Sequence, residues 1–267
     1  MVLLVDVGNT NTVFGVVVAG ELRHQLRLRT DYGRTADELA ALVLPLFDRL
    51  GIVPLEVEAF WVSSVVPPLH PMMRILADEY FGAEAVFVEA GIKTGLSIRS
   101  DNPAEVGADR IVNAVAARDL YGVPTVAVDF GTATTFDVVD TRGDYIGGII
   151  APGIGISAEA LFAQASKLYR VDLQEPKHLI GRNTAGAVQS GVYFGYLGLV
   201  DGILQRLKQQ IEGLQTVVAT GGMAPLIAAG SNHITEVNDM LTLQGLRLIY
   251  ERNIDRGPHE PARRRTS

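Results

Sequence analysis

The sequence predicts an α/β protein of two similar, duplicated lobes with a cleft between them. Two segments of nearly the same layout support this prediction: VDVGNTNTVFGVV from residue 5 and VDFGTATTFDVVD from residue 128. Each follows an apolar run, turns at a glycine among small polar residues and leads into a second apolar run, which is the pattern of a β-hairpin. The remaining segments alternate between strand and helix patterns, which favours α/β architecture.

Size and composition exclude several classes of protein. The 267 residues are 48% hydrophobic and 20% charged, enough for a substantial core in one large or two moderate domains. A net charge of −7 argues against a nucleic-acid partner, and the absence of cysteine excludes disulfides and thiolate metal sites. The N-terminus has no signal-peptide pattern, and no apolar run reaches the ~20 residues that span a bilayer. We therefore expect a cytoplasmic protein without a membrane partner.

The first hairpin places Asp6 at the end of a strand and GNTNT, residues 8–12, in a tight polar turn. Gly8 allows the backbone to approach a ligand, and the Asn, Thr and backbone N–H groups can donate hydrogen bonds to phosphate oxygens. A carboxylate beside such a turn is well placed to hold Mg²⁺, usually through water. The alternative is an ordinary turn that is stabilised by its own side chains and binds no ligand.

The second hairpin repeats the first when Asp6 is aligned with Asp129 without gaps. The alignment then pairs Gly8 with Gly131, Asn9 with Thr132, Asn11 with Thr134, and Thr12 with Thr135. The two aspartates are 123 residues apart, which suggests an internal duplication. Two such turns that face each other across a cleft can hold a nucleoside triphosphate and its metal ion. The repeat favours this interpretation over two ordinary turns.

Other glycine motifs are weaker signals. The chain has no Walker A motif, because Gly-Lys-Ser/Thr does not occur in it. GIGISA at residues 153–158 resembles a dinucleotide-binding fingerprint, but a glycine-rich helix start is the better interpretation.

Strands and helices alternate through the first half of the chain. A half-exposed strand is predicted over residues 21–30, and a helix is predicted to begin at the N-cap Thr35, with Glu38 in the capping-box position, and to end at Gly51. Strand patterns follow at 58–69, running into a Pro-Pro loop, and at 84–91; helix patterns follow at 70–82 and 105–122.

Asp109 and Arg110 fall in the first turns of the helix predicted over 105–122. By spacing alone, compensation of the helix dipole by Asp109 and a surface ion pair of Arg110 are at least as well supported as functional roles.

The second half continues the pattern. Helices are predicted at 157–168 and 184–213, and the second carries glycines at near-helical spacing, which suits a subunit interface or a tight core: Gly186, Gly191, Gly195 and Gly198. The segment 216–227 predicts a strand, a Gly221-Gly222 turn and a helix. That turn can lie against an adenine or ribose, or it can be a simple connection. The tail at 255–267 is charged and rich in Pro and Arg, so we expect it to be mobile.

Taken together, the chain resembles the type III pantothenate kinases, which belong to the acetate and sugar kinase/Hsp70/actin superfamily. The resemblance covers residues 1 to about 250 and rests on DVGNTNT (6–12), NPAEVGADRIVNA (102–114), DFGTATT (129–135), GGIIAPGI (147–154), IGRNTAGAVQSG (180–191) and TGG (220–222). It implies a duplicated ribonuclease-H-like fold, as in actin-like ATPases. It also implies a homodimer that phosphorylates pantothenate with ATP in the first step of coenzyme A biosynthesis. The implied cofactors are Mg²⁺ or another divalent cation, and K⁺ or NH₄⁺.

The resemblance also implies roles for individual residues. ATP would be bound by both turns and by the glycine pair, namely Asp6, Val7, Gly8, Asn9, Thr10, Asn11, Thr12, Val13, Thr132, Gly221 and Gly222. Asp6 would lie near Mg²⁺, and Asp129 would bind the monovalent cation. Pantothenate would be held by Gly107, Ala108, Asp109, Arg110 and, from the partner subunit, Thr184, with Asp109 as the catalytic base.

One position departs from the family pattern. The family usually has an aromatic residue just before the DNP segment, where this chain has Ser100, so the corresponding pantothenate contact is in question.

The predicted organisation is an N-terminal lobe over 1–118, a C-terminal lobe over 119–254 and the tail. Two other functions share parts of this pattern. A sugar or acetate kinase would share both turns but would need another acceptor site, and EVGADR at 105–110 argues against it. An accessory or regulatory protein of the same fold would be favoured by a degraded turn or the loss of Asp109, and neither is seen.

Overall fold

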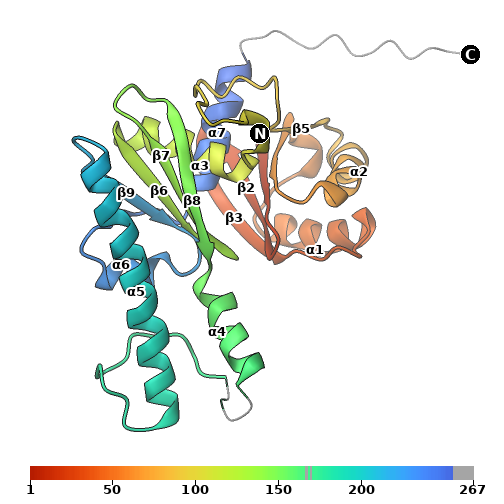
Figure 1. Cartoon of the computed structure of the whole chain (residues 1–267). Helices are drawn as coiled ribbons and strands as arrows, with labels where there is room; N and C mark the ends of the chain where they lie inside the picture. Colours follow the sequence, from red (N-terminus) through yellow and green to blue (C-terminus); the bar gives the residue numbers. More distant parts are fainter. Residues whose placement is uncertain (166–167, 169, 255–267) are drawn as a thin grey trace, which may run out of the picture.

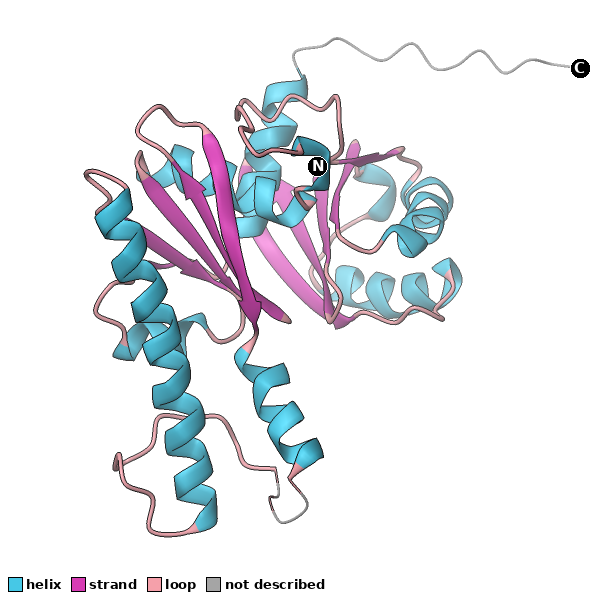
Figure 2. Ribbon diagram, viewed as in Figure 1, coloured by secondary structure: helices cyan, strands magenta, loops and turns pink. Residues whose placement is uncertain are grey.

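The computed structural model describes residues 1–165, 168 and 170–254; the predicted tail lies outside the described residues. It contains two five-stranded sheets side by side, with helices packed around and between them (Figures 1 and 2). Within the described part of the chain, no helix is long and apolar enough to cross a bilayer.

The two sheets have the same topology. The first has the order β3-β2-β1-β4-β5 and consists of β1 (Val2–Val7), β2 (Asn11–Val18), β3 (Glu21–Arg29), β4 (Ala59–Ser64) and β5 (Ala85–Phe87). The second has the order β8-β7-β6-β9-β10 and consists of β6 (Thr125–Phe130), β7 (Ala133–Val139), β8 (Tyr145–Pro152), β9 (Thr216–Thr220) and β10 (Glu236–Val237). In each, three antiparallel strands are followed by two parallel ones. The predicted α/β class and the internal duplication are confirmed.

The helices lie close to their predicted positions. They are α1 (Ala36–Arg49), α2 (His70–Phe81), α3 (Ala108–Tyr121), α4 (Ile154–Gln164), α5 (Thr184–Gln210), α6 (Ala224–Gly230) and α7 (Leu241–Ile254), with short 3₁₀ turns at Pro54–Glu56, Pro67–Leu69 and Pro103–Glu105. Thr35 and Glu38 form the predicted capping box. The GIGISA motif is a helix start, with Gly153 as the N-cap of α4. That helix therefore begins earlier than the 157–168 pattern indicated.

The ungapped alignment of the two hairpins is wrong beyond the turns. Asp6 pairs with Val13 across the first hairpin, whereas Asp129 pairs with Thr135 across the second. The second turn is therefore one residue shorter, and Val13 rather than Thr12 is the structural counterpart of Thr135. A gap of one residue cannot be seen in a pattern of small polar residues, because either register keeps the sequence similarity.

The helices α3 and α7 lie between the sheets and pack against each other (Figure 1). Each also contacts the sheet of the other half of the chain: α3 contacts β6 and β7, and α7 contacts β1 and β4. One core cluster accordingly joins Val2, Leu4 and Trp61 of the first sheet to Leu243 and Leu246 of α7. The segment 119–254, predicted as the C-terminal lobe, thus includes a helix that completes the core of the first sheet.

A buried ion pair fastens α3 to the second sheet. Arg110 Nε donates to Asp137 Oδ1 at 2.7 Å, and the two side chains are 15% and 0% exposed, so a surface ion pair is the wrong description of Arg110. Tyr145 donates its hydroxyl to the same oxygen at 3.0 Å, and Thr135 donates to Oδ2 at 3.1 Å. Burial raises the pKa of Asp137, and the Arg110 charge opposes this shift. Every oxygen of the buried carboxylate is therefore hydrogen-bonded.

We predict that Asp137→Ala lowers the free energy of unfolding by about 3–5 kcal/mol, because it leaves the Arg110 guanidinium buried without its partner. Urea denaturation followed by circular dichroism measures the change. The control is Glu21→Ala, which removes the partner of Arg23 from an exposed pair and should cost at most about 1 kcal/mol. Equal losses in the two variants would contradict a structural role for the buried pair.

Candidate active site

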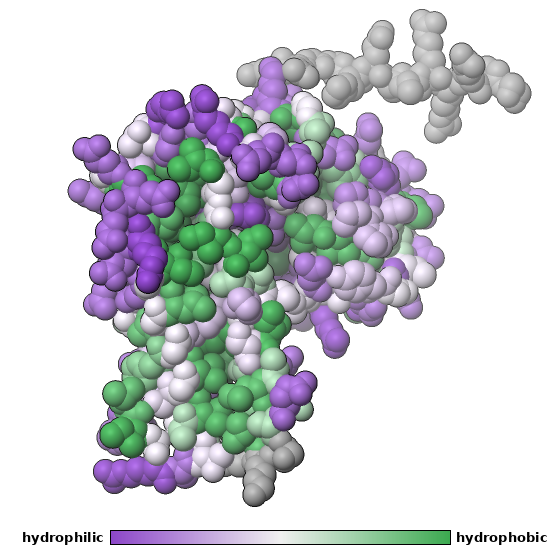
Figure 3. Space-filling view, viewed as in Figure 1, coloured by the Kyte–Doolittle hydropathy of each residue, from purple (hydrophilic) through white to green (hydrophobic). Residues whose placement is uncertain are grey.

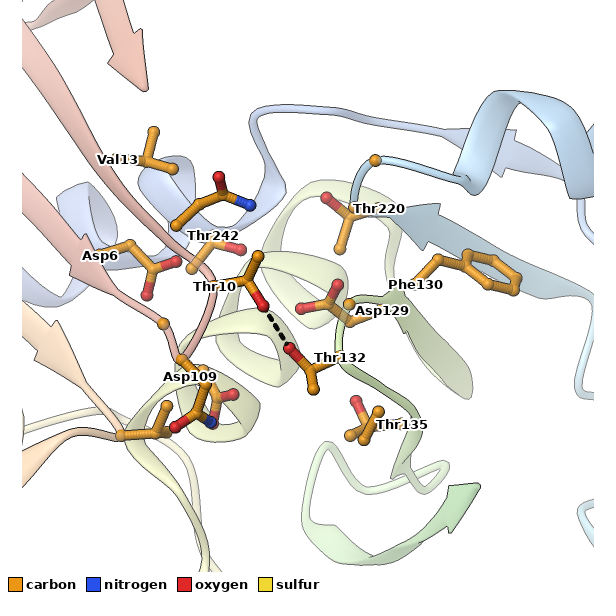
Figure 4. Close-up of a pocket in the computed structure, with 18 of the residues that line it drawn as sticks. Asp6, Thr10, Val13, Asp109, Asp129, Phe130, Thr132, Thr135, Thr220 and Thr242 are labelled. Atoms are coloured by element: carbon orange, nitrogen blue, oxygen red, sulfur yellow. Dashed lines mark hydrogen bonds between the residues drawn. The ribbon is translucent and has the colours of Figure 1, made fainter. Parts of the chain in front are cut away.

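A cavity of about 490 Å³ opens between the two sheets and is lined by both polar turns. Most of the residues predicted to bind nucleotide or cations line it: Asp6, Gly8, Asn9, Thr10, Asn11, Val13, Asp129, Thr132, Gly221 and Gly222. Asp109 joins them from the start of α3 (Figure 4). The topology brings these residues together because β1, β6 and α3 all end or begin at this cleft.

The two turns meet across the cleft. The first is closed by a hydrogen bond from the Gly8 N–H to the Asn11 carbonyl at 3.0 Å. At its tip, Thr10 Oγ1 lies 2.7 Å from Thr132 Oγ1 of the second turn, which joins residues 122 positions apart (Figure 4). Both threonines are exposed, so their hydroxyls and the backbone of each turn are accessible to a ligand. Turns of this kind present N–H and hydroxyl donors to an anion such as phosphate.

Three aspartates face the cleft without an ion pair to a described residue. Burial raises the pKa of Asp6 to about 7, with further contributions from the charges of Asp109 and Asp129. Burial and the charge of Asp109 raise the pKa of Asp129 to about 6. Burial also raises the pKa of Asp109. Carboxylates that repel one another in this way are stabilised in their charged forms when a cation binds between them.

Asp109 is held by the geometry of the helix start. Gly107 is the N-cap of α3, and a Cβ at this position would lie 2.7 Å from Asp109 Oδ1, so a side chain here would displace the carboxylate. The same oxygen accepts a hydrogen bond from the Arg110 backbone N–H at 2.7 Å. This arrangement fixes the carboxylate at the edge of the cleft. A partly buried carboxylate with a raised pKa is suited to accept a proton from a bound alcohol.

Asp129 is supported by residues that the sequence analysis did not select. Asn113 Nδ2 donates to Asp129 Oδ2 at 3.1 Å, and Asn113 Oδ1 accepts from Thr242 of α7 at 2.8 Å. Gly221, with φ +89°, lies so close that a Cβ would be 2.6 Å from Asp129 Oδ1. The signal for Asn113 was present in the sequence: it follows Asp109 by one helical turn, and it is a polar residue between Val112 and Ala114 in an apolar run.

Some predicted residues do not line the cavity. Val7 and Thr12 are buried, and Thr12 Oγ1 lies 3.0 Å from Thr30 Oγ1. Gly107 and Ala108 form the start of α3, and Arg110 is engaged with Asp137. These residues shape the edges of the cleft rather than its surface.

Thr184 lies elsewhere in the same chain. It is exposed at the first turn of α5, whose N-cap is Asn183, and it lines a second hollow with residues of α4 and α5 that include Leu161 and Val192. The side chain of Asn183, and not that of Thr184, therefore caps α5 by accepting from the Gly186 N–H. The start of α5 is at the lower end of the projection that α4 and α5 form in Figure 1. Ser100, where an aromatic residue was expected, has a buried hydroxyl without a hydrogen-bond partner among the described residues.

The described residues contain no group of three or more His, Cys, Asp and Glu side chains that could hold a metal ion alone. The donor set nevertheless fits a nucleotide-bound cation. Mg²⁺ commonly takes one or two carboxylates and completes its shell with phosphate oxygens and water. Among the carboxylates that line the cleft, Asp6 and Asp129 lie at the strand ends that lead into the two polar turns.

Comparisons with known proteins agree with this geometry. The sequence profile of the type III pantothenate kinases matches residues 2–206. The type III pantothenate kinase of Koribacter versatilis is 52% identical over 264 residues, covering 95% of this chain and 96% of its own. That of Myxococcus xanthus is 51% identical over 253 residues, covering 95% and 99%.

Solved structures share the fold at low identity. The activator of the 2-hydroxyisocaproyl-CoA dehydratase from Clostridium difficile, with bound ADPNP, superposes with a TM-score of 0.55 at 11% identity and covers 97% of this chain and 98% of its own. The ethanolamine utilization protein EutJ from Carboxydothermus hydrogenoformans gives 0.53 at 15% identity, covering 92% and 89%. These likenesses support a fold of two duplicated lobes. Because this chain matches relatives that are about 50% identical to it over most of its length, it belongs to the type III pantothenate kinase family.

Proposed function

We propose that this protein transfers the γ-phosphoryl group of ATP to the primary alcohol of pantothenate, giving 4′-phosphopantothenate, the first step of coenzyme A biosynthesis. The observation that carries the proposal is the convergence of both polar turns and Asp109 on one cleft in a chain of this family. Both substrates belong to the cytoplasm, where we expect the enzyme to act. A sugar or acetate kinase is the second candidate. Only the shared fold supports it, because no described residue favours such an acceptor.

The reaction consists of one displacement at phosphorus. The alcohol oxygen of pantothenate forms a bond to the γ-phosphorus, and the bond from that phosphorus to the bridging oxygen breaks, with its electron pair leaving on ADP. The alcohol proton passes to the Asp109 carboxylate. Because little covalent chemistry falls to the protein, catalysis depends on positioning and on stabilising the charge of the transferred group. The donors of the two turns, around Thr10 and Thr132, serve that purpose.

Cations would neutralise the negative charges of the carboxylates and of the ATP phosphates in the cleft. Asp6 would hold Mg²⁺, through water, and Asp129, oriented by Asn113, would hold K⁺ or NH₄⁺ beside the ATP phosphates. When bound, the divalent ion offsets the negative charge of the phosphate oxygens. The support for this assignment is the raised pKa of both carboxylates, which burial and mutual repulsion leave poorly stabilised in the unliganded cleft.

We also propose that the active unit is a homodimer in which Thr184 reaches the pantothenate of the partner subunit. A Cβ added at glycine 191, 195 or 198 of α5 would meet no neighbouring atom within 4 Å, so this face of the helix is open in the single chain. Apolar side chains are exposed on the same projection, among them Ile156, Leu161, Leu179 and Ile180. The projection is largely apolar on the face seen in Figure 3. A second copy of this chain would cover such a surface.

Asp109→Asn tests the role of the base. We expect turnover to fall about 10²–10⁴-fold, because asparagine cannot accept the alcohol proton. The affinity for ATP, measured by calorimetry, should remain nearly that of the wild type. An equal loss of ATP affinity and turnover would mean that Asp109 belongs to the nucleotide site.

A coupled assay of ADP formation with pantothenate tests both the function and the monovalent cation. At constant ionic strength, activity should rise strongly with K⁺ or NH₄⁺ and little with Na⁺, and Asp129→Ala should remove this selectivity. Acetate and common sugars, supplied in place of pantothenate, should give no ADP formation. Equal activity in all three salts would refute the role of Asp129, and no activity with pantothenate would refute the proposed function.

Mixing two inactive variants, Asp109→Asn and Thr184→Arg, tests the shared site. After dissociation and reassociation, one site of each mixed dimer would combine an intact Asp109 with an intact Thr184 from the other chain. We expect about half of the wild-type activity per mixed dimer, as two-fold symmetry requires. The control mixes Asp109→Asn with Asp129→Ala; since one chain supplies both residues of a site, mixing should not raise the activity above that of the unmixed variants. If the first mixture also stays inactive although mixed dimers form, Thr184 serves its own subunit.

A further inference from the structure

A row of paired residues crosses the first sheet at the cleft. Asp6 of β1 pairs with Val13 of β2, and Val13 pairs with Arg27 of β3. Directly paired residues of neighbouring strands project from the same face of a sheet. Arg27 therefore shares the cleft face with Asp6, and its long side chain can extend over the smaller Val13. All three residues line the cavity.

The second sheet supplies an internal comparison for this row. Asp129 pairs with Thr135, and Thr135 pairs with Ile150 of β8. Ile150 thus occupies in the second sheet the place of Arg27 in the first, and its side chain is 63% exposed. The duplicated fold does not need a cation at this position. The two halves therefore differ at this position, where the first has a charged residue and the second an apolar one.

Arg27 is the only positively charged residue among the described residues that line the cavity. Five acidic residues line it as well: Asp6, Asp109, Asp129, Glu159 and Asp239. The guanidinium of Arg27 has neither an ion pair nor a hydrogen bond to any described residue, although Arg23 of the same strand is paired with Glu21. Burial dominates the pKa of Asp6 and of Asp129 and raises both, while the Arg27 charge acts on both in the opposite direction. The guanidinium thus belongs to the same cavity as both carboxylates and is free to bind an anion there.

Arg27 and Asp109 lie on opposite sides of Asp6. The strand β3 is two positions from β1 on one side, and β4 is next to β1 on the other. The chain leaving β4 reaches Val65, which contacts the Gly107 position beside Asp109. In an in-line displacement, the attacking and leaving oxygens lie on opposite sides of the phosphorus. If the alcohol is at Asp109, the leaving group is on the side of Arg27.

We propose that the guanidinium of Arg27 binds the β-phosphate of ATP and stabilises the charge that develops on ADP as the bond to the γ-phosphorus breaks. The inference rests on the proposed kinase function and adds to it a catalytic residue on the leaving-group side. Arginine suits this role because it stays charged and presents several donors to phosphate oxygens. The electron pair of the broken bond remains on the β-phosphate oxygen, and no proton is transferred to or from Arg27.

The test compares Arg27→Gln with Arg27→Lys and with the control Arg29→Gln. Arg29 lies two residues further along β3, projects from the same face and does not line the cavity. Because both glutamine variants remove one charge from the same strand, a general field effect would change them alike. We expect Arg27→Gln to lower kcat about 100-fold, as the loss of one charge-stabilising donor does elsewhere. The lysine variant should recover part of this loss, and Arg29→Gln should behave as the wild type.

Binding measurements distinguish the leaving-group role from other roles. Calorimetry should show weaker binding of ADP to Arg27→Gln, and the KM for pantothenate should stay unchanged. Wild-type kcat in Arg27→Gln, equal losses in Arg27→Gln and Arg29→Gln, or a raised KM for pantothenate with unchanged ADP binding would each overturn the inference. If the wild type does not phosphorylate pantothenate, the proposed function fails, and the ADP titration then decides the role of Arg27: unchanged ADP binding overturns it and weakened binding supports it.

Discussion

The convergence of three carboxylates on one cleft sets the main constraint on this structure. Asp6, Asp109 and Asp129 come from two strand ends and a helix start, and burial with mutual repulsion raises the pKa of the first and third well above the usual range. Such an arrangement is unfavourable in the unliganded protein and would become favourable if cations and a polyphosphate entered together, as proposed above. The packing around the cleft must therefore hold these side chains in place against their own repulsion.

Duplication explains how the chain meets this constraint. The two sheets repeat the same strand order, so Asp6 and Asp129 occupy equivalent strand ends. The exchange of α3 and α7 between the halves then locks the sheets in one relative position. Through Asn113, this helix pair also holds Asp129 directly. The two halves nevertheless differ at the cleft: the second turn is one residue shorter, and Asp109 enters the cleft from the start of α3.

Much of this could be predicted from the sequence because the relevant signals are local. Hairpins, the capping box at Thr35 and the start of α3 each depend on a few adjacent residues. The motifs of the two turns then brought Asp6, Asp129 and the small polar residues beside them, which line the cavity, into one hypothesis. What the sequence could not indicate depends on contacts between distant segments. The partner of Arg110, Asp137, lies 27 residues away on β7, between the apolar residues Phe136 and Val138. The apolar spacing of α7 likewise does not tell which sheet the helix packs against.

The projection formed by α4 and α5 is hydrogen-bonded to residues of the second hairpin. Through these bonds, the proposed dimer would affect the residues that line the cleft. The Gly153 N–H, at the start of α4, donates to the Thr132 carbonyl at 3.0 Å. On α5, the hydroxyl of Tyr196 contacts the hydroxyl of Thr134 and donates to the Pro152 carbonyl at 3.2 Å. Both helices are thus hydrogen-bonded to Thr132 or to residues close to it in the second hairpin. A partner that fixes the projection would also fix this turn, so loss of the dimer should disturb nucleotide binding as well as the pantothenate contact.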